Sequence, residues 1–574
     1  MIRYLIFVVF SISILLSQDK KQELKKIDKK VKKKKQVVFS NNENSSEYLD
    51  LFDESFEKLK INFVDSVNES ELIKSGIKGM MKNLDPYTKL LEGSSLESYD
   101  ILRKGRYGGV GIQIGLRRDT LTVLAPMEDS PAYSEGIHAG DKILKVDSTY
   151  TKGLNVKQVS ELIKGKVGSK VVLGIFRPSS KQNIDFELER SNIKVKHVPY
   201  WGVDKNQIGY VRLTKFSKNA SKDFKQALTE INQQELKGLV IDLRGNSGGL
   251  LSNAIKILDY LCDRGEVLLT RQGKTNRSNK EYFSRSRPIL DIDLPIVVLV
   301  SKSSASASEI VAGTLQDLDR AVIMGQKTFG KGLVQHMYDL NDTLTLKITT
   351  AKYYLPSGRL IQKEDYLDNG FLTDGLDKKD SLFVTKGGRA VKGGGGITPD
   401  VITKTNKFSP YVQSLWREGV FLSFAANYAP FHKDLVPPIQ INSNILNEFK
   451  IFLNDYDLDY NLLGEKQFKQ LNKILSNSSI SVNRYSKNIS RGNLNSNKIN
   501  FLNDINNHFN QLKTIQFSLP ENQIMIKNGI KRELSRVVSG EKERIKASLE
   551  VDKEYIKATE ILLDLSKYFS ILEF

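Results

Sequence analysis

A short run of small hydroxylic residues after a strand-like apolar run constrains the fold of this chain more than any other stretch. Residues 294–300 (LPIVVLV) are continuously apolar and rich in β-branched side chains, which is typical of a strand buried on both faces. Residues 301–309 (SKSSASASE) follow directly, and residues 310–318 have the apolar spacing of a helix. A strand, a tight turn and a helix in this order indicate an α/β sheet whose turn presents a serine hydroxyl at the sheet edge.

The same turn lies at the start of the predicted helix. Free backbone N–H groups and the positive end of the helix dipole meet there. An oxyanion that develops when a serine attacks a carbonyl group would be stabilised at this position. The alternative interpretation is that these serines only cap the helix.

A second motif, residues 325–335 (GQKTFGKGLVQ), also follows an apolar run and argues against mere capping. It holds Lys331 between two glycines and before two apolar residues, so a solvated position is unexpected for this lysine. A serine nucleophile needs a base, and lysine can be that base only when it is neutral, a form that burial favours by lowering the pKa. His336 is the one histidine close to these motifs, and it lacks the neighbours of a Ser/His/Asp triad.

Together, the two motifs resemble the serine/lysine dyad of the carboxyl-terminal processing peptidases, also called tail-specific proteases. The resemblance implies that Ser306 is the nucleophile, Lys331 the general base and Gln335 the residue that orients the lysine. The family also has a glutamate three residues after the nucleophile, which is Glu309 here.

A chain of 574 residues with 40% hydrophobic residues is expected to form three or four domains. The resemblance covers about residues 47–400 and implies a multidomain α/β organisation. The predicted parts are a signal peptide (1–17), a lysine-rich linker (18–46), a helical N-terminal domain (47–104), a β-rich PDZ domain with two helices (105–190), a serine protease core of crotonase-like ββα type (191–406) and a helical C-terminal domain (407–574).

The N-terminus is typical of an export signal. Arg3 precedes an apolar stretch over residues 4–16, and the small Ser17 follows. The stretch is short for a membrane span, although an uncleaved membrane anchor is the alternative. The single cysteine, Cys262, excludes an internal disulfide and is compatible with a periplasmic or cell-envelope location.

The formal net charge of +19 does not by itself indicate nucleic-acid binding. Ten lysines and two acidic residues lie between Lys20 and Lys35, so the linker carries a large share of this charge. We interpret it as a solvated linker, with attraction to an anionic membrane surface as the functional alternative. No aromatic residue is interleaved with these lysines, and nucleic-acid binding is therefore not expected.

Residues 107–115 (YGGVGIQIG) form a glycine-rich turn that leads into an alternating strand. The glycine spacing misses G-x-G-x-x-G and no helix follows, so a nucleotide loop is not predicted. Backbone N–H groups of such a turn can hold a terminal carboxylate while the next strand pairs with the peptide. Together with residues 130–148, the segment resembles the PDZ domain of the same peptidases. That resemblance implies four peptide-binding residues, Gly109, Val110, Gly111 and Ile112.

Residues 238–243 (GLVIDL) read as a buried strand that opens into the loop 244–250 (RGNSGGL). The loop lacks the lysine of a phosphate-binding P-loop. In the peptidase family this segment donates one oxyanion N–H, which we carry to Gly248 with Gly249 as the alternative, and Ala307 would be the other donor. Arg244 and Asp242 are expected to tie the loop to the sheet.

The remaining segments carry weaker signals. Residues 84–91 (LDPYTKLL) are similar to the entry segment of the same family, but their spacing predicts only the end of a packed helical hairpin. Residues 363–392 are longer and more polar than a plain connection and are interpreted as an insertion. Residues 407–574 predict helices that pack on the core or join subunits.

The resemblance, together with the N-terminal export pattern, implies an exported serine endopeptidase that cuts proteins near their C-termini and needs no metal or cofactor. The alternatives are a PDZ adaptor with an inactive protease-like core and an enoyl-hydratase-like enzyme. The intact dyad residues argue against the first, and the PDZ module argues against the second. The expected partners are protein or peptide substrates bound through a free C-terminus, a homo-oligomer or regulatory partner, and a membrane in peripheral or anchored association, but no nucleic acid.

Overall fold

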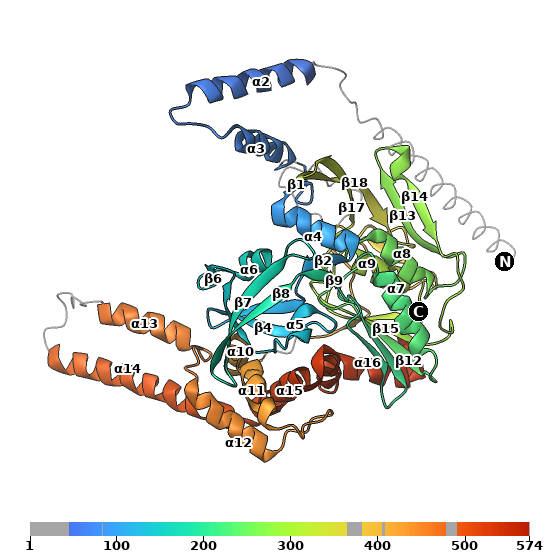
Figure 1. The fold of residues 1–574 in the computed structure, drawn as a ribbon. Coiled ribbons are helices and arrows are strands. Elements are labelled where there is room, and N and C mark those ends of the chain that lie inside the picture. The colour runs from blue at the N-terminus through green and yellow to red at the C-terminus, as the bar shows by residue number, and fades with distance from the viewer. Residues whose placement is uncertain (1–44, 83, 364–380, 405–407, 478–490, 573–574) are drawn as a thin grey trace, which may run out of the picture. The chain divides into compact units, whose positions relative to one another are not determined.

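The computed structural model describes residues 45–82, 84–363, 381–404, 408–477 and 491–572 (Figure 1). The chain divides into two compact units, Met1–Met80 and Met81–Phe574. The predicted signal peptide and nearly all of the predicted linker lie outside the described residues. No described helix is both long enough and apolar enough to cross a membrane.

The first unit contains helix α2 (Ser45–Asn62) and most of helix α3 (Glu69–Lys82). The two helices are in contact at Gly76 and Phe52. They approach so closely that a Cβ atom added to Gly76 would lie 2.9 Å from the Cζ atom of Phe52. Helix α4 (Gly93–Lys104), which the sequence placed in the same helical domain, belongs to the second unit. The predicted N-terminal helical domain therefore stays a prediction.

The segment predicted as a PDZ domain forms an antiparallel sheet in the order β3-β4-β5-β7-β8, with β6 paired to β5. Its elements are β3 (Ile112–Arg117), β4 (Thr120–Pro126), α5 (Pro131–Ser134), β5 (Lys142–Val146), β6 (Thr149–Tyr150), α6 (Val156–Ile163), β7 (Lys170–Arg177) and β8 (Gln182–Glu189). Its core is apolar and fully buried, as shown by Val123, Ile143 and Val159. The short strands β2 (Arg106–Gly109) and β9 (Ser191–Lys194) pair with each other just before and after this sheet.

The protease core is built on a sheet in the order β10-β11-β12-β15-β16-β21, parallel from β11 onward. Its strands are β10 (Tyr200–Val203), β11 (Ile208–Arg212), β12 (Gly238–Asp242), β15 (Ile296–Val300), β16 (Val322–Gly325) and β21 (Val401–Ile402). One face is covered by α7 (Ala220–Ile231), α8 (Leu251–Asp259) and α9 (Ala307–Asp317). Strands β12 and β15 are buried at every residue, which explains their continuous apolar sequences.

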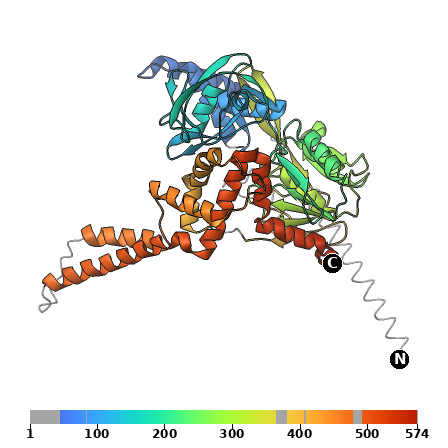
Figure 2. The same cartoon turned by 60° about the horizontal axis from the view of Figure 1, so that its bottom comes forward.

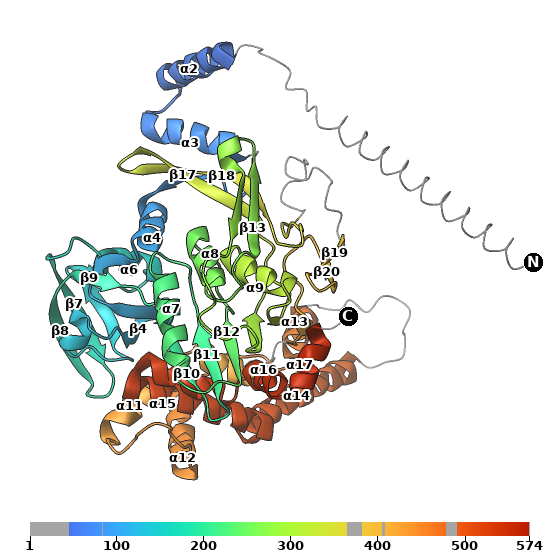
Figure 3. The same ribbon diagram turned by 90° about the vertical axis from the view of Figure 1, so that its right-hand side faces the viewer.

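The other face of this sheet is covered by the end of the chain. Helices α15 (Pro520–Leu549), α16 (Lys553–Leu563) and α17 (Leu565–Leu572) supply apolar side chains that pack against β11, β12, β15 and β16 (Figure 3). The Tyr568 hydroxyl donates to the Ile296 carbonyl at 3.2 Å and accepts from its N–H at 3.1 Å. The expected packing of the C-terminal helices on the core is thus observed, and their expected role in joining subunits stays a prediction.

A second, five-stranded sheet lies beside the core. Its strands are β1 (Lys89–Glu92), β13 (Val267–Gly273), β14 (Lys280–Phe283), β17 (Leu333–Asn341) and β18 (Leu344–Tyr354). The β17–β18 hairpin begins two residues after Lys331, so this sheet fixes the predicted base. In the predicted insertion, β19 (Leu382–Val384) pairs with β20 (Ala390–Lys392), and residues 364–380 are outside the described part.

The helical segment after the core begins with α10 (Pro410–Arg417), α11 (Val420–Tyr428), α12 (Ser443–Phe452), α13 (Glu465–Asn477) and α14 (Arg491–Thr514) (Figure 2). Aromatic side chains dominate its core: the rings of Phe421 and Phe449 stack at 5.4 Å, and Phe424 meets Phe449 edge-on at 5.1 Å. The predicted helical C-terminal domain is thus confirmed as a helical structure with a core of its own.

Candidate active site

Ser306 ends the turn between β15 and α9, and its backbone conformation is unusual. Its φ of 56° and ψ of −113° lie outside the regions that residues other than glycine ordinarily occupy. Such a conformation costs on the order of 1–3 kcal/mol and persists only where the surroundings impose it. Because α9 begins at Ala307, the Ser306 side chain lies at the N-terminus of a buried helix, where the dipole favours negative charge.

The two neighbouring serines have structural roles. Ser304 and Ser308 are fully buried. The Ser304 hydroxyl donates to the Leu243 carbonyl at 2.8 Å, and the Ser308 hydroxyl donates to the Asn246 carbonyl at 2.8 Å. Ser306 is partly exposed, so it is the one of these three serines whose side chain a substrate can reach.

The buried carboxylate of Glu309 links the two predicted dyad residues. Its Oε2 atom accepts from the N–H of Ser306 at 2.8 Å and from the N–H of Lys331 at 2.9 Å. Its Oε1 atom accepts from the Gly330 N–H at 2.6 Å and from the Thr328 hydroxyl at 2.5 Å. Burial raises the pKa of Glu309, whereas these four hydrogen bonds oppose that rise. One side chain therefore sets the distance between the nucleophile's backbone and the base's backbone.

Lys331 has the environment that a lysine requires in order to act as a general base. Burial, assisted by the nearby charge of Lys347, lowers the pKa of Lys331 from its ordinary 10.5 to about 8. At pH 7 roughly one tenth of this lysine is then neutral. The Nζ atom lies 4.6 Å from the centre of the Tyr87 ring, a cation–π contact. Among the hydrogen bonds of the described residues, none joins Nζ to the Ser306 hydroxyl.

The segment that holds Tyr87 was not predicted to belong to the site. The buried Asp85 carboxylate accepts from the N–H groups of Tyr87 at 2.7 Å and Thr88 at 2.9 Å, and from the Thr88 hydroxyl at 2.6 Å. The Thr349 hydroxyl of β18 donates to Asp85 at 3.1 Å and so attaches the turn to the hairpin that follows the base. The similarity of residues 84–91 to the family's entry segment was the one feature of the sequence that could have indicated that this segment belongs to the site.

Gln335 lies on β17 at an irregularity in the pairing with β18. Its amide donates to the Thr349 hydroxyl at 3.4 Å, and Thr349 in turn donates to Asp85. These contacts lead from Gln335 to the Asp85 turn, and they do not include the Lys331 ammonium group. The orienting role implied for Gln335 therefore stays a prediction.

The loop expected to supply an oxyanion donor lies directly against Ser306. A Cβ atom added to Gly248, whose φ is +90°, would lie 2.6 Å from the Ala305 carbonyl oxygen and 2.9 Å from the Ser306 Cβ atom. The Gly248 N–H donates to the Asn246 side chain at 2.9 Å. Among hydrogen bonds between described residues, none has the Gly249 N–H as donor, and none joins the Ala307 N–H to a residue outside α9. The choice between Gly248 and Gly249 as the partner of Ala307 therefore stays a prediction.

The glycine turn of the PDZ domain offers backbone groups more than side chains. Val110 is 1% exposed and packs in the domain core, so its side chain cannot contact a peptide in this structure. Gly109 lies in β2, whereas Gly111 has φ +77° and accepts from the Met127 N–H at 2.7 Å. No hydrogen bond within the described part of the chain has the N–H of Val110 or Gly111 as donor. Ile112, partly buried, begins the strand β3.

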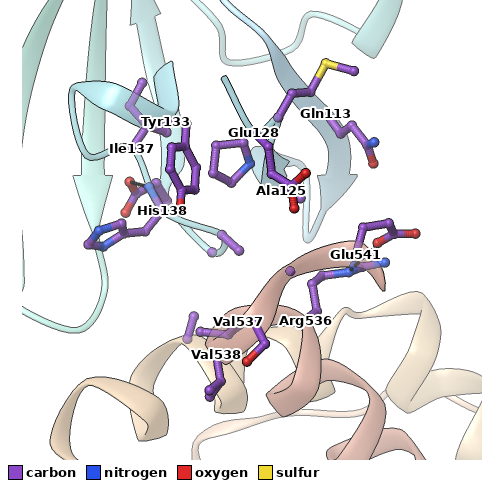
Figure 4. Close-up of a pocket in the computed structure, with 18 of the residues that line it drawn as sticks. Gln113, Ala125, Glu128, Tyr133, Ile137, His138, Arg536, Val537, Val538 and Glu541 are labelled. Carbon is purple, nitrogen blue, oxygen red and sulfur yellow. Dashed lines mark hydrogen bonds and ion pairs between the residues drawn. The ribbon is translucent and has the colours of Figure 1, made fainter. Parts of the chain in front are cut away.

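A cavity of about 1090 Å³ lies away from the predicted dyad, between the PDZ domain and helix α15. Tyr133 and His138 line one side, and Val537 and Glu541 line the other (Figure 4). The described residues that line it include none of the predicted dyad, oxyanion or PDZ loop residues. The predicted dyad therefore lies outside this cavity.

Three family models match successive parts of the chain. Residues 207–370 match peptidase family S41, residues 122–177 match the PDZ domain, and residues 411–562 match the "probable PDZ-protease, C-terminal helical domain". The three matches agree with the sheet, the β-rich domain and the helical segment described above.

Two curated relatives are named as carboxy-terminal processing proteases. A carboxy-terminal-processing protease of Bartonella bacilliformis is 36% identical over 330 residues, which is 57% of this chain and 75% of the relative. The carboxy-terminal processing protease CtpA of Bacillus subtilis is 32% identical over 316 residues, 55% of this chain and 67% of the relative. A solved structure, the photosystem II D1 C-terminal processing protease, is 29% identical with a TM-score of 0.34 and covers 62% of this chain and 92% of its own.

The family-model matches cover most of the PDZ sheet and the segment that holds the Ser306 turn and Lys331, and together with the relatives' names they confirm the resemblance inferred from the motifs. The chain therefore belongs to the family of the carboxy-terminal processing proteases, with an S41 peptidase core, a PDZ domain and a helical C-terminal domain.

Proposed function

We propose that this chain is an exported serine endopeptidase that cuts proteins near their C-termini, with Ser306 as nucleophile and Lys331 as general base. The observation that carries the proposal is the attachment of both backbones to the Glu309 carboxylate, beside a lysine whose pKa is lowered to about 8. A lysine in this environment can accept a proton near neutral pH, whereas a solvated lysine cannot.

The reaction begins when neutral Lys331 takes the proton of the Ser306 hydroxyl as its Oγ atom attacks the scissile carbonyl carbon. The Nζ atom contacts the Tyr87 ring in this structure, and its hydrogen bond with the hydroxyl would form in the substrate complex. Catalytic hydrogen bonds often form only when substrate is bound. The N–H of Ala307 and that of Gly249 or Gly248 stabilise the oxyanion of the tetrahedral intermediate.

The ammonium group of Lys331 then donates its proton to the leaving amine, and the C-terminal fragment departs. Water attacks the acyl group on Ser306, again with Lys331 as the base, and the serine is restored. The orienting role of Gln335 would act through Thr349 and the Asp85 turn, to which its amide is connected. The crotonase-like character of the core is likewise part of this proposal.

Substrate selection would rest on the PDZ domain. The N–H groups of Val110 and Gly111 can bind a terminal carboxylate, and the strand β3 from Ile112 can pair with the substrate tail. Export of the protein is supported by the apolar stretch of residues 4–16 and by the single cysteine. A homo-oligomer, a regulatory partner and membrane association stay predictions.

We expect wild-type protein to shorten a denatured substrate that ends in a free apolar carboxylate, as seen by intact-mass spectrometry. Ser306→Ala should produce no fragment. Amidating the substrate terminus removes a charge-assisted hydrogen bond of roughly 1.5–3 kcal/mol, so the cleavage rate at low substrate concentration should fall by about one to two orders of magnitude. Cleavage by Ser306→Ala would overturn the assigned nucleophile, and equal rates on acid and amide would overturn the role of the PDZ domain.

A further inference from the structure

The loop expected to form the oxyanion hole is anchored at its first residue by the C-terminal helical domain. Arg244 follows β12 directly and opens the loop 244–250. Its guanidinium group binds the Asp242 carboxylate at 3.0 and 2.8 Å, the Asp552 carboxylate at 3.1 and 2.6 Å, and Glu554 Oε2 at 2.7 Å. Asp552 and Glu554 lie at the start of α16, about three hundred residues along the chain.

The contacts of Arg244 with Asp242 and Asp552 are bidentate, and all three of its carboxylate partners are largely removed from water. Asp242 is fully buried, and the side chains of Arg244, Asp552 and Glu554 are 17%, 22% and 24% exposed. Although burial disfavours the charged form, the charge of Arg244 lowers the pKa of Asp242 to about 2. Bidentate pairs between arginine and carboxylate are directional as well as strong, so they fix the orientation of the guanidinium group.

The loop has little freedom between this anchor and the reacting serine. The Gly245 N–H donates to the Ser301 hydroxyl at 3.1 Å, and the Asn246 side chain donates to the Leu213 carbonyl at 2.9 Å. Gly248 lies so close to the Ser306 turn that there is no room for a side chain, since an added Cβ would lie 2.6 Å from the Ala305 oxygen. A displacement of Arg244 is therefore transmitted to the residues that face the nucleophile.

Helix α16 is itself fixed to the core. Its buried Ala558, Ile561 and Leu562 pack on the second face of the sheet. Asp552 also caps the helix, accepting from the N–H groups of Glu554 at 3.0 Å and Tyr555 at 3.2 Å. The same carboxylate thus starts the helix and holds the loop.

We propose that Asp552 and Glu554 are positioning residues of the protease, and that the C-terminal helical domain acts through them and Arg244 to hold the oxyanion loop in its reactive conformation. The inference rests on the proposed function. It gives the helical domain a role in the reaction beyond covering the sheet: it completes the site that stabilises the tetrahedral intermediate.

The variants that test the inference keep the fold while they loosen the anchor. Asp552→Asn preserves the helix cap, because asparagine caps as well as aspartate does, but it removes the charge that holds Arg244. Glu554→Gln removes the second charge. Either single variant leaves Arg244 with two carboxylate partners, and the double variant leaves it with Asp242 alone.

A matched control is available at the opposite end of the same sheet. Asp319, 16% exposed, accepts from Nε of the buried Arg389 at 2.8 Å, and Arg389 also binds Asp400 at 2.8 Å. Asp319→Asn therefore removes one carboxylate from an equally buried arginine that is not part of the oxyanion loop. It reports the effect of a weakened ion cluster on stability alone.

The measurements are kcat and KM for a peptide substrate, the melting temperature, and the rate at which a fluorophosphonate labels Ser306. Removing an oxyanion donor lowers kcat by about a hundredfold to a thousandfold. A loosened loop should lower kcat by a part of this factor. We expect about a tenfold fall in kcat and in labelling rate for each single variant and about a hundredfold fall for the double variant. KM should change less than twofold, and Asp319→Asn should keep the wild-type kcat.

Equal kcat and labelling rates in wild type and double variant would overturn the inference while leaving the proposed function intact. An equal fall in kcat and labelling rate in Asp319→Asn would also overturn the inference. If wild type itself neither cleaves nor becomes labelled at Ser306, the proposed function fails, and the inference fails with it. If the double variant does not fold, the two single variants decide the result by the same criteria.

Discussion

Replacing Lys331 with methionine should abolish cleavage and, at pH 7, make the protein more stable. Activity is lost because methionine cannot accept the proton of Ser306. Stability should rise because folding no longer buries an ammonium group, whereas a methionine side chain of similar length is favoured in the same apolar surroundings. A reacting residue would thus be kept at a cost in stability, as is common at active sites.

The size of the stability gain follows from the pKa of Lys331. The folded value of about 8 is lower than the ordinary 10.5, so folding is disfavoured whenever the lysine is protonated in both states. This penalty is complete below pH 8, shrinks as pH rises from 8 to 10.5 and disappears above that range. A pKa difference of about two and a half corresponds to roughly 3 kcal/mol in the free energy of unfolding. Partial access of water to Lys331 reduces the expected gain in stability to about 1–3 kcal/mol.

Urea unfolding of both proteins at pH 7 and pH 10.5 measures this difference, and cleavage of a labelled protein measures activity. The gain should be present at pH 7 and nearly absent at pH 10.5. Lys331→Arg is the matched control, because it keeps the positive charge and cannot deprotonate, and should be inactive without any gain in stability. Retained cleavage by Lys331→Arg would exclude the serine/lysine mechanism.

Replacing Glu309 with glutamine should disable the site although the residue never touches the substrate. All four partners of the Glu309 carboxylate are donors in the observed geometry, and the Ser306 and Lys331 N–H groups share its Oε2 atom. A glutamine amide presents an NH₂ group to one pair of these donors, so at least one backbone N–H is left without an acceptor. The expected loss of stability is about 2–4 kcal/mol.

Cleavage by Glu309→Gln should fall by at least about a hundredfold, because a shift of about 1 Å between reacting groups has an effect of this size. Thr314→Val is the control: it removes the buried hydrogen bond from the Thr314 hydroxyl to the Leu268 carbonyl, at 2.8 Å, in the same helix but away from the dyad. The control should lose stability and keep its kcat. A Glu309→Gln variant with wild-type kcat would show that this carboxylate does not position the dyad.

Local sequence patterns predicted the parts of the site whose chemistry is encoded in neighbouring residues. The apolar run 294–300 corresponds to β15, and the serine turn and following helix correspond to the Ser306 turn and α9. These elements could be predicted because a buried strand, a small-residue turn and the apolar spacing of a helix each have a distinct pattern. The PDZ domain was predicted from its glycine-rich turn and its resemblance to the PDZ domain of the family, and it is confirmed by its family match.

Long-range contacts could not be predicted in this way. Nothing in the spacing of residues 84–91 indicates that Tyr87 would lie beneath the ammonium group of Lys331, since that contact depends on β1 pairing with β18. The burial of β12 and β15 on both faces required a second cover for the sheet, but α16 and α17 are ordinary amphipathic helices in sequence. Which helices cover which face is a property of packing rather than of periodicity.

The central claim is that Ser306 is activated by a neutral Lys331. It is tested most directly by the pH dependence of covalent labelling of the wild-type protein with a fluorophosphonate, followed by peptide mass spectrometry. Because the base must be neutral, the labelling rate should rise with pH through a single ionisation near pH 8, the modified peptide should contain Ser306, and Lys331→Met should not react at any pH. A rate that follows an ionisation near pH 6.5, as for an unperturbed histidine, or undiminished labelling of Lys331→Met would contradict the account.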